Sequence, residues 1–379
     1  MFQFDVDYYN KEEEKLLQNT IFAKELNSLT NTGLNVDPLD LLAESMFMEQ
    51  KSQTSWTNRE ELINRAVGRI DEFCEYFRLN SRTLVANFSA QDMENHRIER
   101  AGVGASLYAM GKMLGTNAAD WEKINIGSQK DLDFQVASTE ENFLVVECKA
   151  SINKNVTRKT PSISQHKSHI KAKKQKQRAQ RSSDTLIGTI TVIPYDDNTP
   201  AKILLVDPPL PRPFTSPNRF KVIARYRSYE RLIHLIGKPF LLVALNTRIK
   251  ALENIEDIAS LSGLPLVNMN GEPFSIPTSF LNNRSGTRDG SIVGIVQLRR
   301  ERLIFLGIDT SVIHTIVGQS HEEIINWTSS MAGRQEMEII VRPKDLEEER
   351  VETARSNWDI INFDITVNSS GLVLGIASL

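Results

Sequence analysis

The feature that most constrains this chain is a short apolar segment, residues 142–150 (NFLVVECKA), that carries an acid and an amine near its end. Its aromatic and β-branched residues predict a β-strand. Successive side chains of a strand point to opposite faces, so Glu147 and Lys149 point the same way. Charges in such an apolar segment need a partner or a metal ion, because burial of an unpaired charge is costly.

A second short strand is predicted just before this one. Residues 132–137 (LDFQVA) have strand character, and the polar residues 138–141 (STEE) predict a hairpin that joins the two segments. Asp133 lies at the start of the first strand and can face Glu147 and Lys149 across the pair. Two carboxylates that meet at one point suit Mg²⁺, which prefers oxygen ligands. A lysine beside them can orient a water molecule or stabilise charge on a phosphate, so the pattern suits phosphodiester hydrolysis.

The segment that follows the hairpin is basic. No Asp or Glu occurs from residue 148 to residue 183, although many Lys and Arg do, while the net charge of the whole chain is −3. Such a local block of positive charge indicates a polyanionic partner, and a solvated basic helix is the alternative. We predict a helix over residues 164–181 and contacts to DNA phosphates from four of its lysines. These are Lys167, Lys171, Lys173 and Lys174.

The hairpin residues resemble a known family. Asp133, a turn, and then Glu147-Cys148-Lys149 at the end of an apolar strand are similar to the motif of the PD-(D/E)xK nuclease superfamily. The resemblance covers residues 60–245. It implies a restriction-endonuclease-like core, in which a central mixed sheet is flanked by helices. It also implies that Asp133 and Glu147 bind Mg²⁺ (or Mn²⁺), and that Lys149 is catalytic and assists the attacking water.

The family's leading proline is absent before both candidate acids, so Asp131 remains an alternative to Asp133 as the metal ligand. The alternation of side chains along the strand favours Asp133. Many members of the family also use an acid from the helix before the hairpin. In the helix that we predict over residues 90–114, Glu99 is the best candidate for this catalytic acid and Glu94 is the second.

The Glu-x-Lys pattern by itself is not specific. It also occurs as Glu13-Glu14-Lys15, in a charged segment that predicts a helix. The hairpin and the basic segment after it supply the context that favours a nuclease. The alternative interpretation is an edge strand with a surface Glu–Lys pair, which stabilises a protein very little.

Around this core the sequence predicts an α/β protein in three parts. Residues 1–60 are expected to form an N-terminal helical extension and residues 61–245 the nuclease core. Residues 246–379 are expected to form a C-terminal α/β domain for recognition, regulation or oligomerisation. A helix is expected over residues 220–236. The further strands expected are residues 185–195, 201–209, 240–246, 292–298, 302–308, 337–342 and 363–368.

Several classes of protein are disfavoured by the sequence. It has no apolar run long enough for a membrane span and no secretory signal. Its two cysteines, Cys74 and Cys148, form no disulfide or zinc pattern, so we expect a cytoplasmic protein without a membrane partner.

The expected function is a metal-dependent DNA endonuclease of restriction or anti-phage defence. We expect it to act as a homo-oligomer, because two DNA strands need two catalytic centres. The alternatives are a structure-specific or single-strand nuclease of repair or mobile-element processing, and a catalytically silent nucleic-acid-binding subunit.

Overall fold

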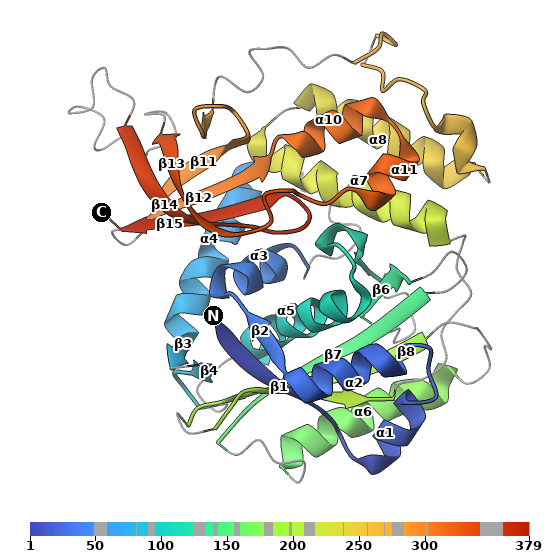
Figure 1. The fold of residues 1–379 in the computed structure, drawn as a ribbon, viewed down its shortest axis with the longest axis vertical. Helices are drawn as coiled ribbons and strands as arrows, with labels where there is room; N and C mark the ends of the chain where they lie inside the picture. Colours follow the sequence, from blue (N-terminus) through green and yellow to red (C-terminus); the bar gives the residue numbers. More distant parts are fainter. Residues whose placement is uncertain are drawn as a thin grey trace. The chain divides into compact units, whose positions relative to one another are not determined.

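The chain folds into two compact units in the computed structural model (Figure 1). One, here called the sheet unit, comprises Met1–Ser55 and Gly68–Pro217, and the other, the barrel unit, comprises Trp56–Val67 and Asn218–Leu379. The structure describes residues 1–48, 59–80, 82–89, 95–124, 133–138, 143–154, 160–177, 185–196, 199–207, 217–237, 239–255, 257–268, 270–274, 284–299, 302–341 and 359–378.

The sheet unit contains a curled, mixed sheet of seven strands. Two neighbouring pairs, β1 with β9 and β7 with β8, are parallel, and the other pairs are antiparallel. In spatial order the strands are β2 (Leu34–Val36), β1 (Phe2–Tyr8), β9 (Lys202–Val206), β8 (Thr185–Pro194), β7 (Phe143–Asn153), β6 (Phe134–Ala137) and β5 (Glu122–Lys123).

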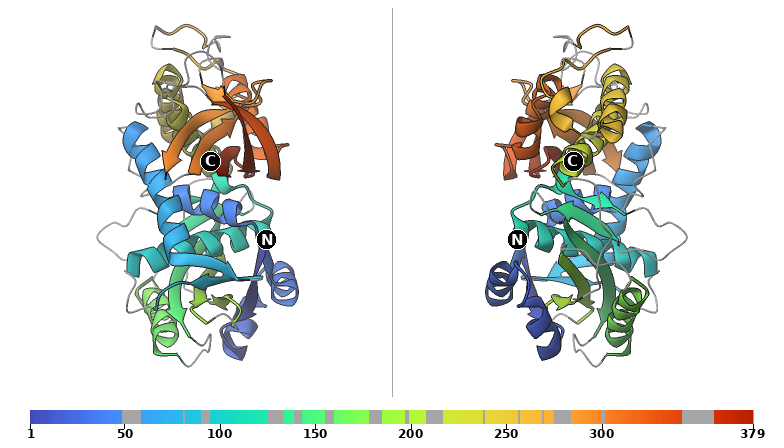
Figure 2. Two further views of the ribbon diagram at one scale, coloured as in Figure 1. Left: turned by 90° about the vertical axis from the view of Figure 1, so that its left-hand side faces the viewer. Right: turned by 90° about the vertical axis from the view of Figure 1, so that its right-hand side faces the viewer.

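Helices cover both faces of this sheet, with α5 (Asn95–Leu114) on one side of β7 and β8 and α6 (Pro161–Gln177) on the other (Figures 1 and 2). Small residues let both helices approach closely. A Cβ atom at Gly102 of α5 would lie 2.1 Å from the Cβ of Ala150 in β7. A Cβ atom at Gly188 of β8 would lie 2.9 Å from Cγ2 of Ile170 in α6. Gly102 and Gly188 therefore allow α5 and α6 to pack closely against the sheet.

Further helices and a second hairpin complete the sheet unit. The helices are α1 (Lys11–Leu17), α2 (Ala23–Thr32), α3 (Pro38–Met48), the 3₁₀ helix η1 (Ala118–Asp120) and the second half of α4 (Arg59–Tyr76), whose first half belongs to the barrel unit. Asn10 caps α1, since its side chain accepts a hydrogen bond from the N–H of Glu13. The hairpin pairs β3 (Phe77–Asn80) with β4 (Thr83–Ala86).

The barrel unit contains a closed antiparallel barrel of six strands. The strands, in order around the barrel, are β10 (Ser285–Gly286), β11 (Ile292–Arg299), β12 (Arg302–Asp309), β15 (Leu372–Ser378), β14 (Asp359–Val367) and β13 (Gly333–Val341). The unit also contains α7 (Pro217–Ile236), α8 (Pro239–Asn254), the 3₁₀ helix η2 (Ile258–Leu261), α10 (Ser311–Gly318) and α11 (His321–Asn326).

Much of the expected secondary structure is confirmed, including the hairpin of β6 and β7 and four strands of the barrel. These lie at residues 292–298 in β11, 302–308 in β12, 337–341 in β13 and 363–367 in β14. Two expectations are wrong. Residues 2–8, expected within a helical extension, form β1 inside the sheet, where alternate residues are buried. Residues 240–246, expected to be a strand, begin α8, and Phe240 and Val243 are exposed because burial there follows the helical period.

The structure also groups the segments differently from the three parts expected from the sequence. The N-terminal residues belong with the sheet, and α7 and α8 belong with the barrel. The mixed sheet flanked by helices does agree with an α/β fold. Within the described residues, no helix has the length and apolar character needed to span a membrane.

Candidate active site

The hairpin of β6 and β7 brings the two predicted acids together. Its register pairs Phe134 with Val146 and, continued by one residue, sets Asp133 opposite Glu147. The N–H of Asp133 donates to the carbonyl of Val146 over 3.1 Å. Its Oδ2 accepts a hydrogen bond of 2.9 Å from the N–H of Cys148. Asp133 is therefore held at the hairpin by both its backbone and its side chain. The alternative ligand, Asp131, lies outside the described residues.

Glu147 and Lys149 lie on the same face of β7, as the two-residue period of a strand requires. The Nζ atom of Lys149 is 2.9 Å from Oε1 of Glu147. The Glu147 side chain is 0% exposed and that of Lys149 is 18% exposed. A carboxylate buried to this degree needs cations or donors around it, because desolvation of an isolated charge is unfavourable.

A second amine completes the cluster. Lys173 of α6 places its Nζ atom 2.5 Å from both oxygens of Glu147 and 3.7 Å from Oδ1 of Asp133. The sequence had suggested that this lysine contacts DNA phosphate. The structure instead places its ammonium group between the two acids, with the side chain 16% exposed. Asp133 and Glu147 are thus close enough to share one cation.

The charges of the cluster shift its pKa values. Burial raises the pKa of Glu147, the charge of Asp133 raises it further, and the two lysines offset this only in part. Burial lowers the pKa of Lys149, but Glu147 and Asp133 outweigh this, so the net shift is upward. Lys149 is therefore a protonated amine at neutral pH, suited to hold a water molecule or a phosphate oxygen by hydrogen bonding and charge.

Glu99 lies on α5, with its side chain exposed. Its carboxylate is near enough to Lys149 to contribute to the raised pKa of that amine, after the larger effects of Glu147 and Asp133. The structure thus places Glu99 in the electrostatic neighbourhood of the cluster, outside the set of direct ion pairs described for Glu147. Glu94 lies outside the described residues.

The other lysines predicted to bind DNA face a different acid. Lys167 and Lys171 place their Nζ atoms 3.0 Å and 2.9 Å from Oε1 of Glu13, whose side chain is 0% exposed. The Nζ atom of Lys167 also lies 4.6 Å from the centre of the Tyr9 ring. The side chain of Lys174 lies outside the part of α6 that the structure describes. Lys167 and Lys171 are therefore mainly internal partners of the buried Glu13 carboxylate.

Sequence reasoning missed both the placement of Lys173 and the burial of Glu13. The placement of Lys173 has a signal in the sequence of α6, where Ile163 and Ile170 are fully buried against the sheet. At 100° per residue, Lys173 flanks that buried face on one side, and Lys167 and Lys171 flank it on the other. No comparable local signal marks Glu13, because its partners lie far away along the chain.

The donor set suits a hard divalent cation. Asp133 and Glu147 provide carboxylate oxygens, and Mg²⁺ is held in many proteins by one or two carboxylates with water completing its shell. Among the described residues, no three His, Cys, Asp or Glu side chains gather into a metal-ligand set. At this point the described part of the chain offers two carboxylates, those of Asp133 and Glu147. The Lys173 ammonium already occupies the position of a cation between them.

No protein-family model, curated protein or solved structure matches this chain.

Proposed function

We propose that this chain is a metal-dependent DNA nuclease, with its catalytic centre at Asp133, Glu147 and Lys149. The observation that supports this most is the hairpin register, which sets two acids opposite each other, one of them fully buried, with an amine on the same face. Two acids and two amines meet there, so their charges are equal in number. Burial and then the charge of Asp133 still raise the pKa of Glu147 against the effect of Lys149 and Lys173, so a divalent cation between the two acids would stabilise the charged form of Glu147.

In the proposed reaction water attacks the phosphorus of a phosphodiester, and the bond to the leaving oxygen breaks. Mg²⁺ or Mn²⁺, held by Asp133 and Glu147, would supply Lewis-acid polarisation of the phosphate and a more acidic bound water. Lys149 orients the attacking water through its ammonium group and stabilises the negative charge that develops on the phosphate oxygens. Glu99 adds negative charge beside Lys149 and helps to keep this amine protonated.

A restriction-endonuclease-like core belongs to this proposal. Its support is the mixed sheet with helices on both faces and with the acids at the β6–β7 hairpin. We also propose that the biological setting is restriction or anti-phage defence and that the chain acts as a homo-oligomer. The number of DNA strands cut per binding event tests the homo-oligomer, because a single catalytic centre nicks a plasmid and paired centres linearise it.

The test is cleavage of plasmid, linear, nicked, forked and single-stranded DNA with Mg²⁺ or Mn²⁺ and with EDTA. We expect cutting with the metals and none with EDTA. Glu147→Ala and Lys149→Ala should fold and bind DNA but not cut. Lys154→Ala, at an exposed lysine just beyond β7, is the matched control and should cut normally. Full cutting by both active-centre variants, or no cutting of any substrate by the wild type, would contradict the proposal.

A further inference from the structure

The sheet face that carries the two acids also carries a buried amide, that of Gln135 in β6. Asp133 directly precedes this strand, and the two-residue period sets Asp133 and Gln135 on the same face. Phe134 and Val136 lie on the opposite face and pack in the core with α5. Gln135 is only 7% exposed. A polar side chain buried to this degree needs a partner for its oxygen, because removal from water without one is unfavourable.

The strands on either side of Gln135 supply no donor for its oxygen. Gln135 is opposite Val145 of β7 and opposite Glu122 of β5. The Val145 side chain is apolar, and an ionised carboxylate such as that of Glu122 only accepts hydrogen bonds. Among the described residues, none donates a hydrogen bond to the buried Oε1 atom of Gln135. This oxygen is therefore available to a bound cation.

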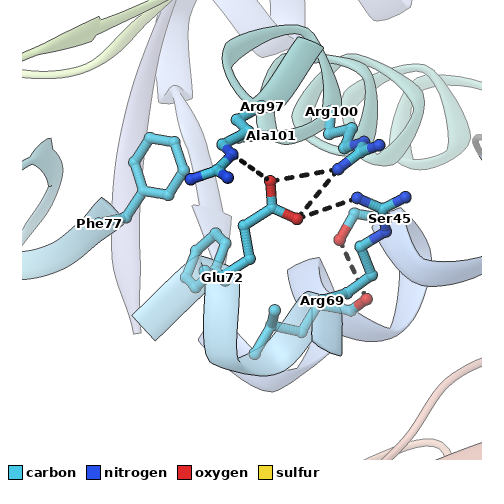
Figure 3. A pocket seen from close by; sticks show the side chains of 9 residues that line it. Ser45, Arg69, Glu72, Phe77, Arg97, Arg100 and Ala101 are labelled. Carbon is cyan, nitrogen blue, oxygen red and sulfur yellow. Dashed lines mark hydrogen bonds and ion pairs between the residues drawn. The ribbon is translucent and has the colours of Figure 1, made fainter. Parts of the chain in front are cut away.

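Another cluster of the sheet unit shows how the fold satisfies an acceptor by itself (Figure 3). Arginines reach both oxygens of Glu72, a partly buried acid of α4. Nε of Arg97 is 3.3 Å from Oε1, and Nη1 of Arg100 is 3.0 Å from Oε2. The acceptor in Gln135 is more deeply buried than Glu72, which is 20% exposed, and it has no such donor in the described part of the chain.

The hairpin register places Gln135 beside the acid pair. Gln135 is opposite Val145, two residues before Glu147, so Gln135 and Glu147 are diagonal neighbours across β6 and β7. Such neighbours are about 7–8 Å apart, within reach of long side chains. Lys149 lies two residues beyond Glu147 on the same face of β7. The acid pair is therefore flanked by an amine in one direction along the strands and by an amide oxygen in the other.

An amide oxygen suits the cation of the proposed metal centre. Magnesium and manganese ions favour oxygen ligands, and amide carbonyls serve in proteins beside carboxylates. Gln135 is neutral, so it adds an oxygen without burying a further negative charge next to Asp133 and Glu147. We propose that Oε1 of Gln135 is a third protein ligand of the divalent ion, together with these two acids. This inference rests on the metal centre of the proposed function, and it does not depend on DNA as the substrate.

Binding of Mn²⁺ to the full chain in the absence of DNA tests the proposal. The electron paramagnetic resonance signal of free Mn²⁺ gives the dissociation constant. Gln135→Met keeps the length of the side chain but removes its oxygen, and it should weaken Mn²⁺ binding roughly tenfold. Gln135→Glu keeps an oxygen and adds charge, so it should bind Mn²⁺ at least as tightly as the wild type. Mn²⁺ should also raise the thermal unfolding temperature of Gln135→Glu more than that of the wild type.

Thr191→Val is the matched control, since it removes a buried polar group from the neighbouring strand β8 with little change in shape. The Thr191 hydroxyl donates to the carbonyl of Gly102 over 3.1 Å and lies 3.0 Å from the hydroxyl of Ser106, both in α5 on the other face of the sheet. Its Mn²⁺ affinity should equal that of the wild type. Thermal unfolding checks that each variant folds, and Glu147→Gln is the reference for the loss of a proposed ligand.

The outcomes separate the ligand from the nuclease. Wild-type affinity in Gln135→Met, or weaker Mn²⁺ binding in Gln135→Glu than in the wild type, would overturn the assignment of Gln135. If Glu147→Gln still loses Mn²⁺ in that case, the metal centre stands without this ligand. Mn²⁺ binding that depends on Gln135, in a protein that cuts no DNA, would keep the ligand and refute the nuclease. Absence of Mn²⁺ binding by the wild type would overturn both.

Discussion

Two buried glutamates of the sheet unit each pair with two lysines, yet their pKa values shift in opposite directions. Glu147 on β7 pairs with Lys149 and Lys173, and Glu13 on α1 pairs with Lys167 and Lys171. Both glutamate side chains are 0% exposed. Yet the pKa of Glu147 is raised, whereas that of Glu13 is lowered.

The difference comes from what else surrounds each carboxylate. Burial raises the pKa of Glu13, but hydrogen bonds from Lys171, from the backbone N–H of Asp207 and from Lys167 outweigh burial. At Glu147, burial acts together with the charge of Asp133, and the two lysines do not compensate. The Glu13 cluster is electrostatically satisfied and stabilises the fold. The Glu147 cluster has a second acid and is suited to receive a metal ion. A buried Glu–Lys cluster alone therefore does not identify a catalytic centre.

The largest expected effect separates the two clusters by activity. Glu147→Gln should reduce DNA cleavage with Mg²⁺ by roughly a thousandfold, about 4 kcal/mol of barrier, because a metal ligand is lost. Glu13→Gln, compared at equal concentrations of folded protein, should cut at nearly the wild-type rate. Initial rates of plasmid nicking measure both. An equal loss in the two variants would remove the functional distinction between the clusters.

The next largest effect is on stability, and here the substitution of Glu13 should have the larger effect and that of Glu147 the smaller. The lowered pKa of Glu13 means that its charged form is favoured in the folded state, so Glu13→Gln should reduce the free energy of unfolding by about 3 kcal/mol. The raised pKa of Glu147 means that its charged form is disfavoured there, so Glu147→Gln should change stability little or increase it. Urea unfolding at pH 7 measures both values. A larger loss in Glu147→Gln would reverse our assignment of roles.

A third effect concerns the lysines. Lys173 holds its ammonium between Asp133 and Glu147, so a divalent ion must displace it. Lys173→Met should therefore lower the Mg²⁺ concentration that gives half-maximal cleavage, by roughly three- to tenfold, about 1 kcal/mol. The control, Lys171→Met, removes a partner of Glu13 and should leave the Mg²⁺ requirement unchanged. A higher Mg²⁺ requirement in Lys173→Met would show that Lys173 supports metal binding.

The smallest effect comes from a third acid, Asp40 of α3. Burial and then the charge of Asp37 raise its pKa to about 6, which Lys112 and a hydrogen bond from Tyr108 offset only in part. Between pH 4 and pH 6 the folded state thus binds a proton that the unfolded state has released, so stability falls as the pH rises. The contribution is on the order of 1 kcal/mol, since the side chain is partly exposed. Urea unfolding across this range should show a flatter pH profile for Asp40→Asn. Identical profiles would contradict the raised pKa.

The local features of the site could be predicted from the sequence. The strand predicted over residues 142–150 follows from its apolar and β-branched residues and corresponds to most of β7. The common face of Glu147 and Lys149 follows from the two-residue period of a strand. The hairpin follows from the polar turn between two short apolar segments. In each case the cause lies within a few residues of the effect, so a single sequence contains the information.

Other features were decided by contacts between distant segments. Residues 2–8 alternate apolar and polar side chains, but their place between β2 and β9 depends on residues far along the chain. The apolar residues 240–246 fit either a strand or a helix, and the surroundings of α8 select the helix. Short apolar segments are ambiguous in this way, because burial by distant partners outweighs local propensity.

The sequence by itself determined that Glu147 and Lys149 share one face of β7 and that their charges need partners. The tertiary structure alone decided which partners they obtain, since Lys173 reaches Glu147 across 26 positions of the chain and Lys167 reaches Glu13 across 154. The physical reason is that a buried charge is stabilised by any donor or cation that the fold brings within a few ångströms, and separation along the chain does not enter that interaction.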